Sequence, residues 1–311
     1  MTELRDIATC KTLEHSRLCL SDISVMYFRL MHACAEMRFD NQRDADAWLT
    51  IQMLFTKTVS FIQLLSGFSF QDREVTLSPI IDPTVLFSIA RDVYEAVSSF
   101  QIAFFLSKTE GQKQVAYNLY RIAGLMERQH FDFNPDNKSA QVTLDAELQD
   151  IIELKREIKH SAYYKGLSKQ SKHQIMGIVN SPYPKARFIF QDGGAIPVVW
   201  EKAYNLYGIK EKAFGSLYAY LSNHVHTTYL SLTQYGMGFS KGNPQFMHFA
   251  CFASRILSAL LSIYIVDFCK NYPKAKEIFD MQEDRLQWII DRINIDFRGK
   301  SYALSEKWQE I

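Results

Sequence analysis

Two helical segments carry side chains that could do acid–base chemistry. The first holds Arg91 and Glu95, which are spaced i,i+4 and therefore share one face of a helix. The second holds His226, whose imidazole could accept or donate a proton near neutral pH. In a shared site, His226 would be the general acid or base, Arg91 would stabilise negative charge, and Glu95 would orient one of them. The alternative is a solvated Arg91–Glu95 ion pair and a hydrogen-bonded core histidine.

Hydroxyl groups surround His226 on the same predicted helix. Tyr218, Ser222 and Tyr229 lie at helical spacings from it, so we expect one face that could bind a ligand. His224 faces elsewhere, because residues i and i+2 are about 200° apart on a helix. The two histidines therefore do not form the metal clip of an H-x-x-x-H motif. A hydrolase using Ser222 is a weaker alternative, because nucleophilic serines usually lie on sharp exposed turns.

A basic run lies between residues 155 and 173, where Glu157 is the only acid. It could hold a phosphate backbone while Tyr163 and Tyr164 stack on bases. Alternatively, it is an exposed helix face balanced by the acids that precede it. The cations of this run are Lys155, Arg156, Lys159, Lys165, Lys169 and Lys172.

No motif predicts a cofactor or a metal ion. No two histidines are spaced as in an H-x-x-x-H motif, and the cysteines form no C-x-x-C pair. The sequence also lacks the phosphate-binding motifs G-x-x-x-x-G-K-[ST] and G-x-G-x-x-G. We therefore expect neither a cofactor nor a metal.

Hydrophobic residues recur at helical spacing through most of the chain, which predicts an all-α bundle of about eight main helices. One short β-hairpin is expected near 187–199, with Pro197 confining its second strand to an edge. The whole chain, 1–311, would form a single helical domain, or two lobes with a break near 181–199. The main helices are expected near 11–37, 43–66, 83–107, 109–130, 144–165, 210–234, 244–271 and 282–294.

The composition limits the class of protein. Hydrophobic residues make up 47% of the 311 residues and charged residues 22%, which suffices for a sizeable core. A net charge of +1 gives no global attraction to nucleic acid or anionic lipid. Five scattered cysteines without a C-x-x-C pair are typical of a reduced compartment. The strongest apolar run is shorter than the roughly 20 residues of a membrane span, so we expect a cytoplasmic protein without membrane insertion.

Two segments resemble the motifs of a bacterial group of all-helical domains of unknown function. Residues 91–96 read R-D-V-Y-E-A and fit its R-x3-E motif; residues 218–226 read Y-A-Y-L-S-N-H-V-H and fit its Y-x2-L-S-x2-V-H motif. The similarity covers roughly residues 45–270. The group is distantly similar to HEPN domains, many of which are RNases in toxin and abortive-infection systems. Their R-x(4–6)-H motif places the arginine on the histidine's own helix, whereas residues 219–222 ahead of His226 contain no arginine.

The sequence leaves two main functions open. We expect an uncharacterised helical protein that binds a partner or a ligand, with Tyr218, Ser222 and Tyr229 as ligand-binding residues. The alternative that the resemblance implies is a metal-independent RNase in a stress or phage-defence role, with Arg91 acting on the substrate together with His226. The partner is unknown; RNA, another protein and a second copy of the chain all remain open.

Overall fold

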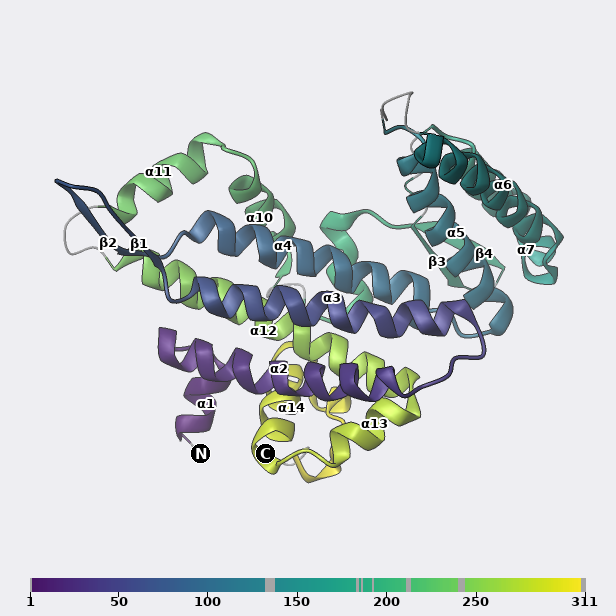
Figure 1. The fold of residues 1–311 in the computed structure, drawn as a ribbon. Coiled ribbons are helices and arrows are strands. Elements are labelled where there is room, and N and C mark those ends of the chain that lie inside the picture. The colour runs from purple at the N-terminus through teal and green to yellow at the C-terminus, as the bar shows by residue number, and fades with distance from the viewer. Residues whose placement is uncertain are drawn as a thin grey trace. The chain divides into compact units, whose positions relative to one another are not determined.

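The computed structural model describes residues 2–131, 138–182, 185, 187–191, 193–210, 214–239 and 244–308. The fold is mostly helical, at 75%, with 13 helices of seven or more residues among those described, and it carries small antiparallel sheets (Figure 1). The helical class is thus confirmed. The predicted count of about eight helices is too low, because short helices and a broken long one add to it.

The chain divides into two compact units. Unit 1 comprises residues 1–98 and 200–311, and unit 2 comprises residues 99–199. The prediction of one domain, or of two lobes with a break near 181–199, stays a prediction; residues 183, 184, 186 and 192 of that break lie outside the described residues. Unit 1 contains α1 (Thr2–Ala8), α2 (Leu13–Ala35), α3 (Gln42–Leu64), β1 (Phe68–Gln71), β2 (Thr76–Ile80), α4 (Pro83–Phe100, except its last two residues), η2 (Trp200–Tyr207), α10 (Leu217–Val225), α11 (Tyr229–Gly238), α12 (Gln245–Asn271), α13 (Pro273–Asp280), α14 (Asp284–Arg298), η3 (Lys300–Tyr302) and η4 (Glu306–Trp308).

The core of unit 1 is built around α12. Every residue from 256 to 269 is buried. The Tyr27 hydroxyl of α2 donates to the Leu261 carbonyl at 3.0 Å, and the Trp48 ring of α3 packs edge-on against Phe268 at 5.0 Å. Among the described residues, α12 is the one helix long and apolar enough to cross a membrane, and 83% of its most apolar stretch is buried inside the protein. It is therefore a core helix of unit 1.

A buried ion pair fixes α14 against α12. The Arg298 guanidinium donates to both Asp267 carboxylate oxygens, at 2.8 and 3.1 Å, and both side chains are almost completely buried. The same guanidinium lies 3.8 Å from the ring centroid of Tyr302. The Tyr302 hydroxyl in turn occupies the space beside Gly208, where an added Cβ would lie 2.1 Å from it. The pair therefore also orders the segment after α14.

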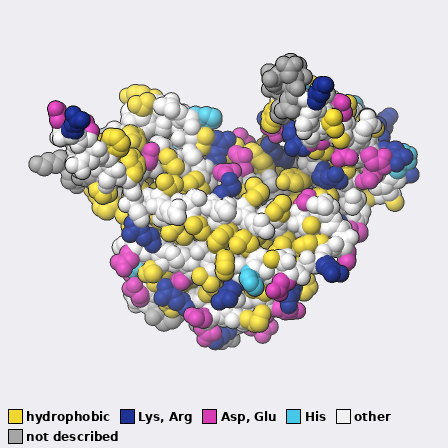
Figure 2. Space-filling model, viewed as in Figure 1, with side chains coloured by type: hydrophobic (Ala, Val, Ile, Leu, Met, Phe, Trp, Pro, Cys, Tyr) yellow, Lys and Arg dark blue, Asp and Glu magenta, His cyan; other side chains and the backbone are white. Residues whose placement is uncertain are grey.

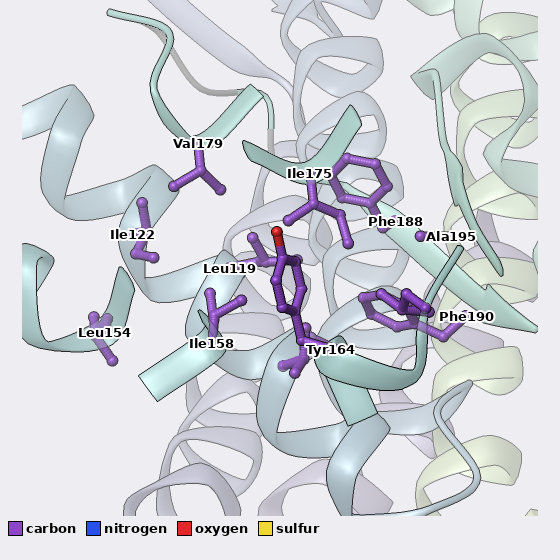
Figure 3. Packing of buried hydrophobic residues seen from close by; sticks show 13 residues of the cluster. Leu119, Ile122, Leu154, Ile158, Tyr164, Ile175, Val179, Phe188, Phe190 and Ala195 are labelled. Carbon is purple, nitrogen blue, oxygen red and sulfur yellow. The ribbon is translucent and has the colours of Figure 1, made fainter. Parts of the chain in front are cut away.

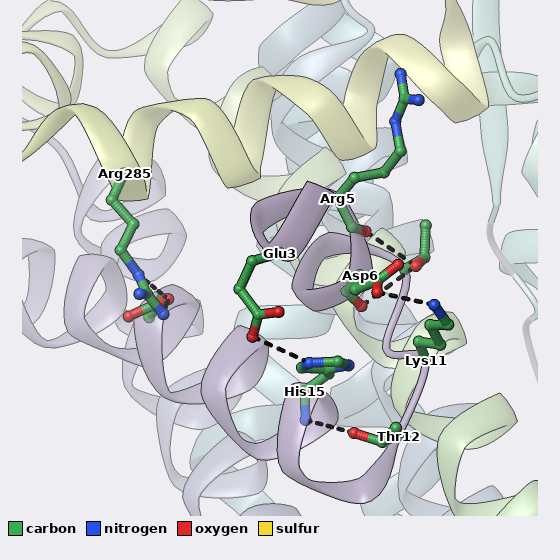
Figure 4. Close-up of polar contacts among 9 residues, drawn as sticks. Glu3, Arg5, Asp6, Lys11, Thr12, His15 and Arg285 are labelled. Carbon is green, nitrogen blue, oxygen red and sulfur yellow. Dashed lines mark hydrogen bonds and ion pairs between the residues drawn. The ribbon is translucent and has the colours of Figure 1, made fainter. Parts of the chain in front are cut away.

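Polar contacts on the surface attach the N-terminal helices to this core (Figure 4). The His15 ring lies 3.2 Å from a carboxylate oxygen of Glu3, which joins α2 to α1. Arg285 of α14 forms an ion pair with Asp22 of α2 at 2.9 Å. These exposed pairs position α1 and α2 with little gain in stability.

Unit 2 has a hydrophobic core of its own. It contains η1 (Gln101–Phe105), α5 (Glu110–Arg128), α6 (Lys138–His160), α7 (Ala162–Gly166), α8 (Lys169–Val179), β3 (Phe188–Gln191) and β4 (Gly194–Pro197). Leu119 of α5, Ile158 of α6, Ile175 of α8 and Phe188 of β3 point toward one another (Figure 3). The predicted hairpin near 187–199 is confirmed, because β3 pairs antiparallel with β4.

The helix predicted over residues 210–234 is wrong as a single element. Residues 211–213 lie outside the described part of the chain, and the rest forms α10 and α11 with a break at residues 226–228. His226 has extended backbone angles, φ −97° and ψ 136°. The Thr228 hydroxyl then accepts from the Ser231 N–H at 3.2 Å and caps a new helix.

The sequence Ser107-Lys-Thr-Glu110 fits a capping box, but the capping box in the structure lies two residues later, at Thr109 and Gln112. The Thr109 hydroxyl accepts from the Gln112 N–H at 3.3 Å, and the Gln112 side chain accepts from the Thr109 N–H at 3.2 Å. Glutamine serves the third position as well as glutamate does, because either side-chain oxygen can accept this bond. The helix start itself, α5 at Glu110, agrees with the prediction.

Removal of the buried Arg298 guanidinium should destabilise unit 1 strongly. Arg298→Ala leaves Asp267 buried without its cation, so we expect a loss of about 3–5 kcal/mol in the free energy of unfolding. The matched control is Arg292→Ala on the same helix, which breaks the exposed i,i+4 pair with Asp296 and should cost less than about 1 kcal/mol. Urea denaturation followed by circular dichroism measures both. Equal losses in the two variants would contradict the assignment.

Candidate functional site

Helix α4 places Arg91 and Glu95 at the edge of the unit 1 core. The helix begins at Pro83, where the Asp82 carboxylate accepts from the Thr84 N–H at 2.8 Å and caps the first turn. Its core face is buried, including Phe87 and Tyr94. The side chains of Arg91 and Glu95 are 20% and 33% exposed, so they lie between core and solvent.

Arg91, Glu95 and Tyr218 form a closed hydrogen-bonded ring, which we call the Arg91 network. Nε of Arg91 donates to Oε1 of Glu95 at 3.1 Å, and Nη2 donates to the Tyr218 hydroxyl at 3.1 Å. The Tyr218 hydroxyl donates to the same Glu95 oxygen, also at 3.1 Å. The guanidinium carbon lies 5.1 Å from the Tyr218 ring centroid, within range of a cation–π contact.

The Arg91 network is suited to holding α10 against α4. Burial raises the pKa of the Tyr218 phenol, and the neighbouring Glu95 carboxylate adds to this, although the bond from Arg91 opposes it. The phenol therefore keeps its proton at neutral pH and is no general base. Glu95 accepts two bonds within the network, which leaves its carboxylate engaged with its neighbours.

His226 lies outside the Arg91 network. It is the residue at the C-terminal end of α10, its side chain is exposed, and its N–H donates to the Ser222 carbonyl at 3.2 Å. Within the described ranges, no hydrogen bond or ion pair joins its ring to Arg91 or Glu95. The structure thus brings two of the three predicted catalytic residues together and adds Tyr218, a predicted ligand-binding residue.

The single face expected from Tyr218 to Tyr229 is wrong, because the helix ends between them. Ser222 is half-buried on α10, and its hydroxyl makes no bond to the His226 ring in the part of the chain that is described. Tyr229 is the first residue of α11 and is 86% exposed. These two side chains therefore belong to different helices.

His224 is the histidine that packs into the core. Its ring centroid lies 4.5 Å from that of Phe87 and 4.8 Å from that of Tyr220. Neither ring nitrogen has a hydrogen-bond partner among the described residues, and burial lowers the pKa of the imidazole. Sequence spacing correctly separated it from His226, since the two residues face different ways.

The sequence missed a second hairpin, β1–β2, and a pocket beside it. Phe68 pairs with Ile80 and Phe70 with Leu77, with an irregularity between the two pairs. At the base of the hairpin, the end of α3, the start of β1 and the start of α4 line a pocket of about 360 Å³. Its lining residues are Ser60, Gln63, Leu64, Gly67, Phe68, Asp82 and Val85. Gly67 has φ +70°, which glycine adopts without strain and which turns the chain from α3 into β1.

Apolar side chains lie on the surface at this end of unit 1 (Figure 2). Helix α11 and the hairpin lie at the same end of unit 1 (Figure 1). We call the exposed apolar residues of these elements the hairpin–α11 surface: Phe68, Phe70, Val75, Leu77, Tyr229, Leu230, Leu232, Met237 and Phe239.

The basic run lies in unit 2, on the end of α6, on α7 and on α8. Lys159, Lys165 and Lys169 are exposed, Lys155 and Lys172 are half-buried, and Arg156 forms an ion pair with Glu153. The predicted stacking tyrosines are engaged elsewhere. Tyr164 is buried in the unit 2 core, and the Tyr163 ring packs edge-on against Phe190 at 5.5 Å.

Comparisons with known proteins identify no relative. No family model, no curated protein and no solved structure matches the chain. Across the described residues, no group of three or more histidine, cysteine or acidic side chains could hold a metal ion. The resemblance to HEPN-like domains therefore stays a prediction.

The buried His224 should make the stability of unit 1 fall as the solution becomes acidic. Its folded pKa lies below the ordinary 6.5, so the unfolded chain takes up a proton first, and stability declines as pH drops from about 7 through 6.5 toward the folded pKa. Asp291, whose pKa burial raises to about 6, acts with the opposite sign in the same window. We therefore expect the difference between His224→Leu and the parent, measured by urea denaturation, to grow in favour of the variant as pH falls.

The control for this experiment is His226→Ala, because His226 is exposed. Its free energy of unfolding should follow the parent across the same pH range. If His224→Leu also runs parallel to the parent, the imidazole of His224 does not titrate differently in the folded and unfolded chains, and the pH dependence has another origin.

Proposed function

We propose that this protein is a binding domain that takes up an extended segment of a partner polypeptide along the outer edge of β1. One apolar side chain of the partner would enter the pocket at the base of the hairpin. The observation that carries the proposal is the hairpin–α11 surface, which places an uncharged strand edge, an apolar pocket and several exposed aromatic rings together.

The edge of β1 is suited to strand addition. The sheet contains two strands, so β1 has one side without a neighbouring strand among the described residues. Its four residues, Phe68–Gln71, carry no charge and no proline, and all four are exposed. Natural proteins usually protect such edges with charges or prolines, as Pro79 does on β2. An edge without this protection offers its backbone groups to an incoming strand.

The pocket would give this edge selectivity. Its volume of about 360 Å³ falls at the lower end of the range for small-ligand sites. Leu64, Phe68 and Val85 supply apolar walls, while Asp82 adds a carboxylate at the side. Every second side chain of a bound strand points to the same face, and one of these could fill the pocket. Strand-adding domains distinguish their partners by such pockets.

The aromatic residues around the pocket fit a contact surface between proteins. Phe70 is 70% exposed and Tyr229 is 86% exposed. Exposed apolar patches on soluble proteins mark interaction sites, and aromatic residues and methionine are enriched in protein interfaces. Met237 and Phe239 on α11 extend the same surface.

Site-specific photo-crosslinking in cells tests this proposal. A photoreactive benzoylphenylalanine at position 70 should give a discrete adduct with a partner, because Phe70 projects from the hairpin. The matched control places the same residue at Val142, which is 69% exposed on α6. Adding Leu64→Glu, which brings a charge into the pocket wall, should abolish the adduct at position 70.

Three results would overturn the proposal. They are the same adducts from positions 70 and 142, no adduct from either, or an adduct at position 70 that survives Leu64→Glu. An adduct of twice the chain mass would assign the surface to a second copy of this chain instead of a different partner.

The RNase alternative has its own test. Among the described residues, no hydrogen bond or ion pair joins His226 to the Arg91 network, so we expect the purified protein to cleave a fluorophore–quencher RNA no faster than its His226→Ala variant does. Arg91→Lys serves as a second comparison, because it keeps a cation but removes the planar donor fork. Cleavage by the parent that both substitutions abolish would make RNA cleavage the function.

A further inference from the structure

The basic run of unit 2 concentrates positive charge on a chain that is nearly neutral overall. Between residues 155 and 187 there are eight lysines and arginines and one acid, Glu157. The preceding turns of α6, residues 145–153, carry four acids and no cation. The charge is therefore separated along α6, with the positive end beside α7 and α8. We call Lys155, Lys159, Lys165, Lys169 and Lys172 the basic surface.

Little within unit 2 neutralises the basic surface. Arg156 is held by Glu153, but Lys155, Lys159, Lys165 and Lys169 make no ion pair in the described parts of the chain. The Lys172 ammonium donates to the Lys165 carbonyl at 2.6 Å, which keeps α8 and its charge next to α7. Burial, together with the like charge of Lys159, lowers the pKa of Lys155. Like charges at i,i+4 destabilise a helix, and a bound polyanion would remove that cost.

The side chains next to the basic surface indicate which polyanion it could bind. Single-stranded nucleic acid is held largely by stacking of bases on aromatic rings. Here Tyr164 is buried with its hydroxyl 3.4 Å from the Lys172 carbonyl, and Tyr163 packs against Phe190. The surface therefore lacks a stacking platform from these tyrosines and offers ammonium groups instead.

A membrane surface fits less well. Peripheral membrane helices combine cations with exposed apolar side chains that enter the lipid. Between residues 155 and 175, Ile158, Leu167 and Ile175 are buried in the unit 2 core. No large apolar side chain of this segment is exposed, and the exposed Leu148 and Ile152 lie on the acidic part of α6. A duplex, with its high density of phosphates and its bases stacked inside, needs only cations for sequence-independent binding.

We propose that the basic surface of unit 2 binds the phosphate backbone of double-stranded nucleic acid without reading its sequence. The four lysines without acid partners, together with Lys172, contact successive phosphates. RNA and DNA duplexes share this chemistry, and binding is independent of the β1 edge.

Fluorescence anisotropy with labelled duplexes of about 20 base pairs, at salt concentrations of roughly 50–200 mM, tests the proposal. The probes are duplex RNA, duplex DNA, the single RNA strand, and vesicles of phosphatidylcholine with phosphatidylserine. With three to five phosphates neutralised, the logarithm of the binding constant should fall with the logarithm of salt concentration with a slope of about −3 to −4.5.

The test variant carries Lys159→Glu, Lys165→Glu and Lys169→Glu. We expect duplex affinity to fall about tenfold or more and the salt slope to flatten by about 3. The control carries Lys202→Glu, Lys274→Glu and Lys300→Glu, three exposed lysines of unit 1, and changes the net charge equally. The control should bind duplex as the parent does. A triple glutamine variant at 159, 165 and 169 should give a smaller loss in the same direction, and circular dichroism verifies the fold of each protein.

Several results would overturn the proposal: no duplex binding at the lowest salt concentration, an equal loss in the control, a single strand bound as tightly as the duplex, or vesicles bound in place of duplexes. Equal affinity for RNA and DNA would identify the shared phosphate backbone as the ligand. Tighter binding of one of the two would identify that duplex as the natural ligand, and the proposal would stand.

Discussion

The burial of α12 is the constraint on which unit 1 depends. A helix that is apolar on all sides must be covered on all sides, and 14 consecutive residues of α12, 256–269, are buried. The few polar groups on this helix need partners because burial removes their water. Asp267 forms an ion pair with Arg298, and the Ser262 carbonyl accepts a hydrogen bond from the Asn294 side chain at 3.0 Å. Both partners come from α14, so the C-terminal part of the chain is required to complete a core that begins with α2.

Helix α12 is less completely buried toward its N-terminal end, and the proposed binding surface lies at this end. Phe249 is buried beside Phe87, whereas Met247 and Phe252 are about half exposed. Helices α10 and α11 lie over this end but leave their own apolar side chains in solvent. The exposed aromatic surface is therefore continuous with the core. A partner seated there would extend the packing that α14 provides toward the C-terminal end of α12.

The sequence predicted the helical class, the start of α4 and the β3–β4 hairpin because each has a local signal. Asp82-Pro83 is a helix start by its own chemistry, and two glycines between apolar strands favour a turn. The break after α10 has only a weak signal, a threonine that could equally have continued the helix. Arg91 and Glu95 were identifiable by spacing, but their bond to Tyr218 depends on how α10 packs on α4. The β1 strand reads F-S-F-Q, and this alternation of apolar and polar residues normally indicates a strand with one buried face. The exposure of all four residues could therefore not be inferred from the sequence.

Residue type alone does not decide which polar groups are available for chemistry. Arg91 and Glu95 form the pattern that most suggested catalysis. In the structure, however, Arg91 donates to Glu95 and Tyr218, and Tyr218 donates to Glu95, so the polar groups of the network are hydrogen-bonded to one another. The lysines of the basic surface form an unremarkable run, yet the acids that could balance them precede them on α6, where Glu147 pairs with Arg128 and Glu153 with Arg156. A satisfied network stabilises a fold, whereas uncompensated charge raises the free energy of the isolated protein and lowers that of a complex. The binding chemistry of this chain is therefore to be sought where its polar groups lack internal partners.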